Sequence, residues 1–339
     1  MKERLTIRDV AREANVSIAT VSKALNGLDV VTPKTIEKVT EAAKKLHYTP
    51  NLMGKQLKTK TTKMIGLYAH SITGPYFNTL IEAIVEESEN HHYGVNVVIS
   101  SDKQVLSSHL LGNMVDGFIG FEELIDEESL NTIRSEGVKA VFMDRKINDQ
   151  SISSVVFDSR KAGRIATQHL LENGHKRIGF LPGHPNVYDS DERFIGFKEV
   201  MIENSLKINS KWIITGLFEE KESYLNMKRY LTETPREEWP TAWIAGNDLS
   251  AIGVIKAINE LELRVPDDFS VMGFDDIELL GYFKPSITTI QNPIKEQGKQ
   301  AVKELLKLIN NQKCGENNIL DCQLIIRETT MRNEDKSFQ

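Results

Sequence analysis

Residues 6–27 have the sequence TIRDVAREANVSIATVSKALNG, which predicts two short helices joined by a tight turn. Thr6 and Ser17 are residue types that cap helix N-termini. Asn15 stands between the two helices, where the chain must turn and asparagine tolerates a left-handed backbone. Apolar residues recur at helical spacing in both halves of the stretch: Ile7, Val10, Ala11 and Ala14, then Val21, Ala24 and Leu25. A third helix is expected to begin at Thr32 and Pro33, which completes a helix-turn-helix plan.

The region after this head is basic and has little to bury. Residues 51–63 have the sequence NLMGKQLKTKTTK, and we expect a linker with at most two turns of helix. Residues 1–60 carry 12 Lys and Arg against 6 Asp and Glu, although the formal net charge of the chain is −6. A basic head on an acidic body suits a protein that holds phosphate groups at one end only.

From residue 64 onward, short apolar runs alternate with helical stretches. The first series of runs is 64–69, 95–100, 115–121, 138–144 and 154–158, and the second is 177–183, 211–216, 241–247, 269–276 and 287–291. Continuous apolar strands between helices predict parallel sheets covered on both faces. The expected fold class is therefore α/β, with a three-helix head and a body of two doubly wound parallel-sheet lobes. A ligand cleft is expected at the carboxyl ends of the strands.

The 339 residues of the chain suit two or three domains. Several functional classes are excluded by motifs that the sequence lacks. The charged N-terminus has no apolar signal core, so we expect a cytoplasmic protein. Cys314 and Cys322 fit no metal-ligand pattern and are expected to be free thiols. Neither a phosphate-binding loop, nor HExxH, nor GxSxG is present. We therefore predict no catalytic residue, no metal and no cofactor.

Ordered motifs continue through almost the whole chain. They include DSRKAG (158–163), HLLENGHKRIGFLPG (169–183), PTAWIAGNDLSAIG (240–253), LRVPDDFSVMGFDD (263–276) and PSITTIQNP (285–293). With residues 6–27 and 33–51, this series resembles the lac repressor/galactose repressor family of bacterial transcription regulators over about residues 5–332. The resemblance implies a repressor, dimeric or tetrameric, whose body is built like a periplasmic sugar-binding protein. No leucine heptad follows the body, so a homodimer is expected.

The resemblance also sets the expected domain boundaries. Residues 1–50 would form the helix-turn-helix domain, 51–63 the hinge helix or linker, and 64–339 the effector-binding and dimerisation domain. Within the body, the N-lobe would comprise about 64–159 plus 292–322. The C-lobe would comprise about 160–291 plus 323–332.

The second helix of the head is expected to enter the major groove of operator DNA. By the resemblance, Ile18, Ala19 and Lys23 occupy the base-discriminating positions. Lysine can donate to guanine, and the two apolar side chains can touch thymine methyl groups. The family commonly has arginine where Lys23 stands, and lysine lacks its planar fork. Residues expected to position phosphates are Thr6, Ser17, Thr20, Ser22 and Asn26, although each hydroxyl could instead cap a helix.

The linker resembles the family's hinge helix, for which Asn51, Lys55 and Leu57 are the expected DNA contacts. Leu57 would wedge between base steps in the minor groove of DNA bound by a dimer. Gly54 departs from the usual alanine and costs about 1 kcal/mol of helix propensity. A plain flexible tether is the alternative interpretation.

Side chains from both lobes are expected to bind a small sugar: Tyr76, Phe77, Asp144, Arg193, Phe218, Asn247 and Asp275. Aromatic rings suit the C–H face of a sugar, and Asp, Asn and Arg suit its hydroxyls. The alternatives are core packing for the two phenylalanines, helix capping for the two aspartates, and a structural ion pair for Arg193 with Glu192 or another acid. Asp248 is expected to cap a helix.

The expected function is a repressor of carbohydrate-utilisation genes controlled by a sugar. The alternative is a global carbon-catabolite regulator controlled by a phosphorylated carrier protein.

Overall fold

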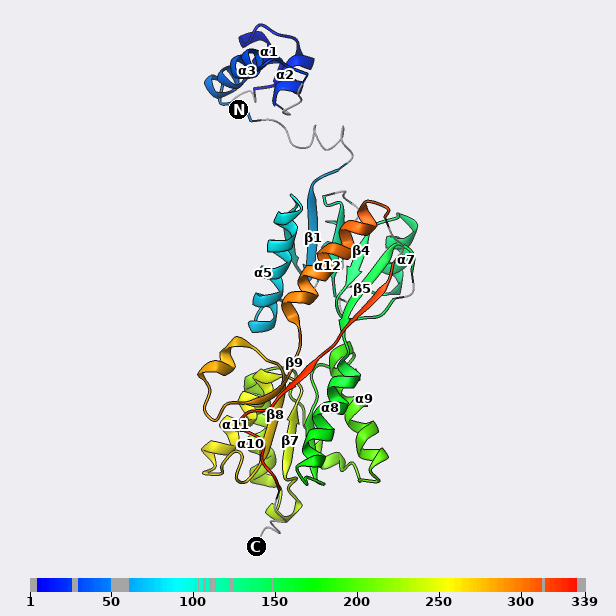
Figure 1. The fold of residues 1–339 in the computed structure, drawn as a ribbon, viewed down its shortest axis with the longest axis vertical. Coiled ribbons are helices and arrows are strands. Elements are labelled where there is room, and N and C mark those ends of the chain that lie inside the picture. The colour runs from blue at the N-terminus through cyan, green and yellow to red at the C-terminus, as the bar shows by residue number, and fades with distance from the viewer. Residues whose placement is uncertain are drawn as a thin grey trace. The chain divides into compact units, whose positions relative to one another are not determined.

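The computed structural model describes residues 5–25, 30–49 and 61–333, apart from 101, 103, 106–107, 110–111, 113, 122–124, 148 and 313–314. The chain divides into two compact units, Met1–Thr62 and Lys63–Gln339. They are the head and the body (Figure 1).

The head contains three helices, α1 (Ile7–Glu13), α2 (Ile18–Leu25) and α3 (Pro33–Lys45). Its small core joins all three helices through Val10, Val21 and Val39, which are fully buried. The expected turn residue Asn15 has a left-handed backbone, with φ 47°. Ser17 caps α2, because its hydroxyl oxygen accepts from the amide of Thr20 at 3.1 Å.

The N-lobe of the body is a six-stranded parallel sheet in the order β10-β5-β4-β3-β1-β2. Its strands are β1 (Met64–Ala69), β2 (Gly94–Ile99), β3 (Gly117–Gly120), β4 (Ala140–Phe142), β5 (Ile152–Phe157) and β10 (Asn317–Leu320). One face packs against α5 (Pro75–Asn90) and α12 (Ile294–Ile309), and the other against α7 (Glu127–Ser135). Coverage on both faces explains why the inner strands β1, β3, β4 and β5 are buried almost throughout, whereas the edge strands β2 and β10 are partly exposed.

The C-lobe is a five-stranded sheet in the order β11-β9-β8-β7-β6, in which only β11 is antiparallel to its neighbour. Its strands are β6 (Ile178–Leu181), β7 (Ala242–Ala245), β8 (Ser270–Asp275), β9 (Thr288–Gln291) and β11 (Gln323–Ile325). The helices α8 (Ser159–Glu172) and α9 (Tyr188–Glu203) cover one face, and α10 (Glu220–Glu233) and α11 (Asp248–Glu260) the other. Short 3-10 turns are η2 (Ser210–Trp212), η3 (Arg236–Glu238) and η4 (Glu278–Tyr282).

The strand expected over residues 211–216 is wrong. Asn209 caps a 3-10 turn instead, by accepting from the amide of Lys211. Trp212 is buried by this turn, and only an isolated bridge joins Ile213 to Phe180 at the edge of the sheet. The apolar residues of this run are therefore buried by packing rather than by sheet pairing.

The chain passes between the two lobes three times: after β5, after β9 and between β10 and β11 (Figure 1). Cys322 lies in the last crossover, and burial raises the pKa of its free thiol to about 11. Cys314 lies outside the described residues. Within the described part of the chain, no helix is both long and apolar enough to span a bilayer.

Candidate functional site

The expected base-reading side chains lie on the solvent side of α2. Ile18, Ala19 and Lys23 are exposed, whereas Val21 and Ala24 on the opposite side of the helix are buried. Ile18 is 45% exposed. This face is consequently available to a partner, and contact with bases stays a prediction.

The expected phosphate-positioning hydroxyls already have partners inside the head. Thr6 donates through its amide and its hydroxyl to Asp9, each at 2.8 Å, and these bonds lower the pKa of the Asp9 carboxyl. The hydroxyls of Ser17 and Thr20 lie 2.8 Å apart. Ser22 is half-buried on α2. The other expected DNA contacts, Asn26, Asn51, Lys55 and Leu57, lie outside the described residues.

All seven expected effector residues line one cavity of about 600 Å³ in the body. The N-lobe contributes Tyr76, Phe77 and Asp144, and the C-lobe contributes Arg193, Phe218, Asn247 and Asp275. The cavity lies where the carboxyl ends of strands from both sheets meet, as expected for doubly wound sheets. Whether these side chains bind a ligand stays a prediction.

Arg193 is the only cation among the buried lining residues described, and it is 3% exposed. Its guanidinium donates to the carbonyl of Gly246 at 2.6 Å and to Asp275 Oδ1 at 3.2 Å. It also lies 4.7 Å from the ring centroid of Phe274. Its Nε is buried without a partner, so one donor is left over. The ion pair given as the alternative for Arg193 is present, and its partner is Asp275 rather than Glu192.

Two glycines bring α8 and α9 close enough together to place Arg193. A Cβ on Gly163 would lie 2.1 Å from the carbonyl oxygen of Arg193, and one on Gly196 would lie 2.1 Å from that of Arg160. Only a residue without a side chain permits this approach of one helix backbone to another.

Asp275 ends β8 in a backbone conformation rarely found outside glycine, with φ 106°, and Asp276 follows at φ 56°. Such conformations cost about 1–3 kcal/mol and are concentrated at functional sites. Asp275 Oδ1 accepts from Arg193 and, at 2.9 Å, from the side chain of Asn292 in the crossover after β9. Neither Asp275 nor Asp144 caps a helix: the next described helix after Asp144 begins at Ser159.

The helix cap expected at Asp248 is made instead by its neighbour Asn247, which also lines the cavity. Asn247 caps α11 by accepting from the amide of Ser250 at 2.9 Å, and it also donates to the carbonyl of Phe218. Asp248 is fully buried, and accepts from the hydroxyl of Thr289 and the amide of Ile277. Burial, followed by the nearby Asp275 charge, raises the pKa of Asp248 well above its ordinary value. The capping role expected for Asp248 is therefore wrong.

The aromatic residues that line the cavity differ in their ring contacts and in their backbone conformations. Tyr76 and Phe77 pack edge to face with centroids 5.1 Å apart, and Phe77 reaches Phe121 at 5.6 Å. Phe218 and the preceding Leu217 are both left-handed, with φ 60° and 54°. Both expected phenylalanines are half-buried at the cavity, and Phe77 also packs against the N-lobe core.

Asp189 is a lining residue that the sequence interpretation missed. It lies on the first turn of α9 and accepts from the hydroxyl of Ser159 at 2.5 Å. Burial raises the pKa of its carboxyl, although the Arg193 charge opposes this effect. Its position four residues before Arg193 on one helix was the signal that could have found it.

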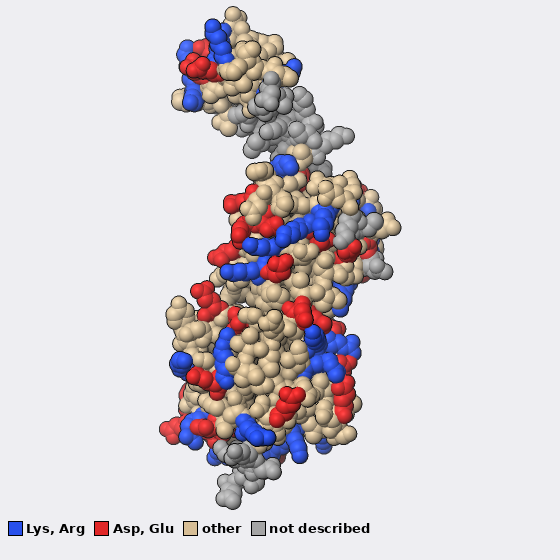
Figure 2. All heavy atoms as spheres, in the orientation of Figure 1, with Lys and Arg blue, Asp and Glu red and all other residues tan. Residues whose placement is uncertain are grey.

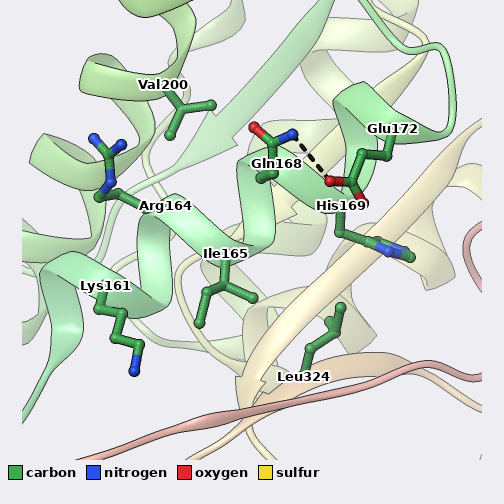
Figure 3. A pocket seen from close by; sticks show the side chains of 8 residues that line it. All are labelled: Lys161, Arg164, Ile165, Gln168, His169, Glu172, Val200 and Leu324. Carbon is green, nitrogen blue, oxygen red and sulfur yellow. Dashed lines mark hydrogen bonds between the residues drawn. The ribbon is translucent and has the colours of Figure 1, made fainter.

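A second hollow lies on the outer face of α8 (Figure 3). Its polar groups already have partners: Arg164 binds Glu199 and Glu203, Lys161 binds Asp321, and Gln168 donates to Glu172. The interlobe cavity is thus the better candidate. In the view of Figure 2, acidic and basic side chains alternate over the body without one sign dominating.

The chain matches two protein-family models. The model for bacterial regulatory proteins of the lacI family matches residues 6–51, and that for the periplasmic binding protein-like domain matches residues 167–330. The HTH-type transcriptional repressor PurR of Haemophilus influenzae (strain PittEE) is 36% identical over 314 residues, which cover 91% of this chain and 92% of that protein. The chain belongs to the LacI family. It is a DNA-binding transcriptional repressor of that family.

Other LacI-family proteins are similar over comparable lengths. PurR of Histophilus somni (strain 2336) is 34% identical over 331 residues, covering 96% of this chain and 98% of that protein. The lac repressor dimer bound to operator and the anti-inducer ONPF has a TM-score of 0.84 and 29% identity, covering 97% of this chain and 100% of that one. A LacI-family regulator from Enterococcus faecium with bound ribose has a TM-score of 0.73 and 25% identity, covering 80% of this chain and 100% of that one.

Proposed function

We propose that this repressor binds a pseudo-palindromic operator as a homodimer in the cytoplasm, and that a mono- or disaccharide in the interlobe cavity controls this binding. The genes it controls would serve carbohydrate utilisation. We assign DNA reading to residues 1–50, the hinge to 51–63 and effector binding to 64–339, with the two lobes divided at about 159/160, 291/292 and 322/323.

The observation that carries the sugar proposal is that aromatic rings and charged side chains line the same cavity. The N-lobe side presents the adjoining rings of Tyr76 and Phe77 with Asp144, and the C-lobe side presents Phe218 with Asp189, Arg193 and Asp275. A sugar ring has an apolar C–H face and an edge of hydroxyls that both donate and accept. It can therefore satisfy both walls at once.

Most of the charged side chains that line the cavity are carboxylates, which accept hydrogen bonds. Three aspartates, Asp144, Asp189 and Asp275, line it beside the single buried guanidinium of Arg193. A flat nucleobase is the competing ligand class, because the same rings could stack on it. A nucleobase also has N–H donors, but its ring carbonyl and nitrogen acceptors need donors from the lining, whereas every hydroxyl of a sugar can turn to donate to a carboxylate.

Solved relatives support the proposal by what their titles name. The E. faecium regulator holds ribose in its structure, and the lac repressor is bound to both operator and ONPF. By this likeness, Ile18, Ala19 and Lys23 would discriminate bases, and Asn26, Asn51, Lys55 and Leu57 would contact DNA. Thr6, Ser17, Thr20 and Ser22 would position phosphates.

Isothermal titration calorimetry on the full chain tests the ligand class. The panel holds D-glucose, D-galactose, D-ribose, cellobiose and maltose, with hypoxanthine, guanine and adenine as the competing class. We expect a sugar to bind, and Asp275→Ala to weaken this binding about 5- to 150-fold, because a buried polar group left unpaired in the complex costs about 1–3 kcal/mol. Binding of a nucleobase alone, or of a phosphorylated carrier protein alone, would overturn the sugar assignment.

A further inference from the structure

A fully buried glutamine stands behind the N-lobe wall of the cavity. Gln297 lies on the first turn of α12, among the apolar side chains of the N-lobe core. Its Oε1 accepts from the hydroxyl of Tyr76 at 3.0 Å. Its Nε2 donates to the carbonyls of Met143 at 3.1 Å and Val155 at 3.0 Å. Both ends of the amide are therefore occupied, as a buried amide requires.

These three bonds join the elements that build one wall of the cavity. Tyr76 lies on the first turn of α5, Met143 directly precedes Asp144, and Val155 lies two residues before Phe157. Tyr76, Met143, Asp144 and Phe157 all line the cavity, whereas Gln297 itself does not. A single side chain outside the cavity thus joins α5, the residue that follows β4, and β5.

The same bonds decide which part of Tyr76 faces the cavity. Its hydroxyl is directed to Gln297, so the ring is left as the surface that a ligand meets. Burial, helped by the nearby charges of Asp189 and Asp275, raises the pKa of this hydroxyl well above its ordinary value. The hydroxyl therefore keeps the proton that it donates to Gln297.

The segment before α12 is bonded to the opposite wall. Asn292, in the crossover from β9, donates to Asp275 Oδ1 at 2.9 Å. Five residues later, Gln297 is bonded to Tyr76. One short crossover segment therefore holds a lining residue of each lobe.

We propose that Gln297 is a positioning residue of the effector site, which turns the hydroxyl of Tyr76 into the core and sets the N-lobe wall from the crossover helix. The use of this wall for a sugar rests on the proposed function, but the positioning contact does not. Effector affinity would then depend on a side chain that the effector never touches.

A double-mutant cycle on the full chain tests the contact without any ligand. Tyr76→Phe, Gln297→Met and the double variant are compared by urea unfolding, followed by far-ultraviolet circular dichroism. Methionine approximates the length of glutamine and removes all three bonds. The two side chains share one hydrogen bond. We therefore expect the effect of the double variant on the unfolding equilibrium constant to differ, by about threefold or more, from the product of the two single effects. Gln300→Met is the matched control on the same helix, since Gln300 is half-buried and its side chain donates to Glu304 rather than to the cavity wall.

A spectroscopic measurement separates positioning from general support. In protein labelled with ¹³C-tyrosine, the Tyr76 ring signal is assigned from its loss in Tyr76→Phe. This signal should move in Gln297→Met and stay in place in Gln300→Met. If a panel sugar binds the wild type, its affinity should fall about fivefold or more in Gln297→Met and stay unchanged in Gln300→Met.

Multiplicative effects of Tyr76→Phe and Gln297→Met, together with an unmoved ring signal, would overturn the proposal. Failure of every sugar in the panel would contradict the proposed effector class alone. The cycle and the ring signal would still decide the role of Gln297.

Discussion

The contact of α8 with α9 predicts that one added methyl group disables the effector site. Alanine at position 163 would place its Cβ 2.1 Å from the carbonyl oxygen of Arg193, whereas real Cβ contacts essentially never fall below 3.0 Å. The two helix backbones must therefore separate by about 1 Å. Forcing an extra carbon into a packed core costs about 1–3 kcal/mol, against a gain of about 1 kcal/mol in helix propensity.

We expect Gly163→Ala to destabilise the C-lobe by about 1 kcal/mol, because a steric cost of about 2 kcal/mol exceeds the gain in helix propensity of about 1 kcal/mol. All three tryptophans, Trp212, Trp239 and Trp243, lie in this lobe, so their fluorescence in a urea titration reports its unfolding. Displacement of α9 also moves Arg193, and sugar affinity should fall tenfold or more, which corresponds to about 1.4 kcal/mol.

The matched control is Gly281→Ala, since a Cβ at this position meets no atom within 4 Å. It should leave both the urea midpoint and the affinity unchanged. A Gly163→Ala protein as stable as the wild type, with the same sugar affinity, would refute the account of how α9 is positioned.

Four further outcomes follow from the structure and the sequence. Asp275→Ala should destabilise the C-lobe by about 3–5 kcal/mol, because it leaves a buried guanidinium uncompensated; Asp275→Asn should cost less in the same urea titration. Burial lowers the pKa of His175 from its ordinary 6.5. Between the folded and the unfolded pKa, the unfolded chain therefore binds a proton at this histidine that the folded chain does not. Stability should therefore fall as the pH drops below about 6.5, and a slope unchanged by His175→Gln would refute this. Lys23→Ala should lose about 1–3 kcal/mol of discrimination at one guanine of the operator, whereas Lys207→Ala, on the body, should not; equal losses in a duplex-selection assay would contradict this assignment. Leu57→Ala should reduce operator bending and preference while sparing nonspecific binding; a gel-shift bend assay that matches the wild type would reduce residues 51–63 to a tether.

The parts of the fold that follow local rules could be predicted from the sequence. Helical spacing, the cap at Ser17 and the turn at Asn15 define the first two helices of the head, because each depends on residues only a few positions apart. The apolar runs of the body predict parallel sheets for the same reason. The run at 211–216 was misassigned because apolar content alone does not distinguish a paired strand from a buried turn.

The effector site was predictable only in part. Carboxylates, arginine and aromatic residues after strands were identifiable, since such positions meet at one edge of a sheet. Adjacent residues of capping type, Asn247 and Asp248, could not be distinguished, because the choice depends on contacts with Phe218 and Thr289. Gln297 carried no local signal: its partners lie 142 to 221 residues away along the chain.

The most direct test of the central claim is operator affinity measured with and without the effector. A duplex selected from random sequences is titrated with the full chain by fluorescence anisotropy, in the presence and absence of the sugar that binds in calorimetry. For the wild type, we expect the sugar to change the operator dissociation constant about 5- to 150-fold, the usual range of allosteric coupling. For Asp275→Ala, the same concentration of that sugar should change this constant less, while operator affinity without sugar stays at the wild-type value. Two results would contradict the claim that this cavity controls the head. One is a wild-type operator dissociation constant that no panel sugar changes, and the other is a sugar response in Asp275→Ala equal to that of the wild type.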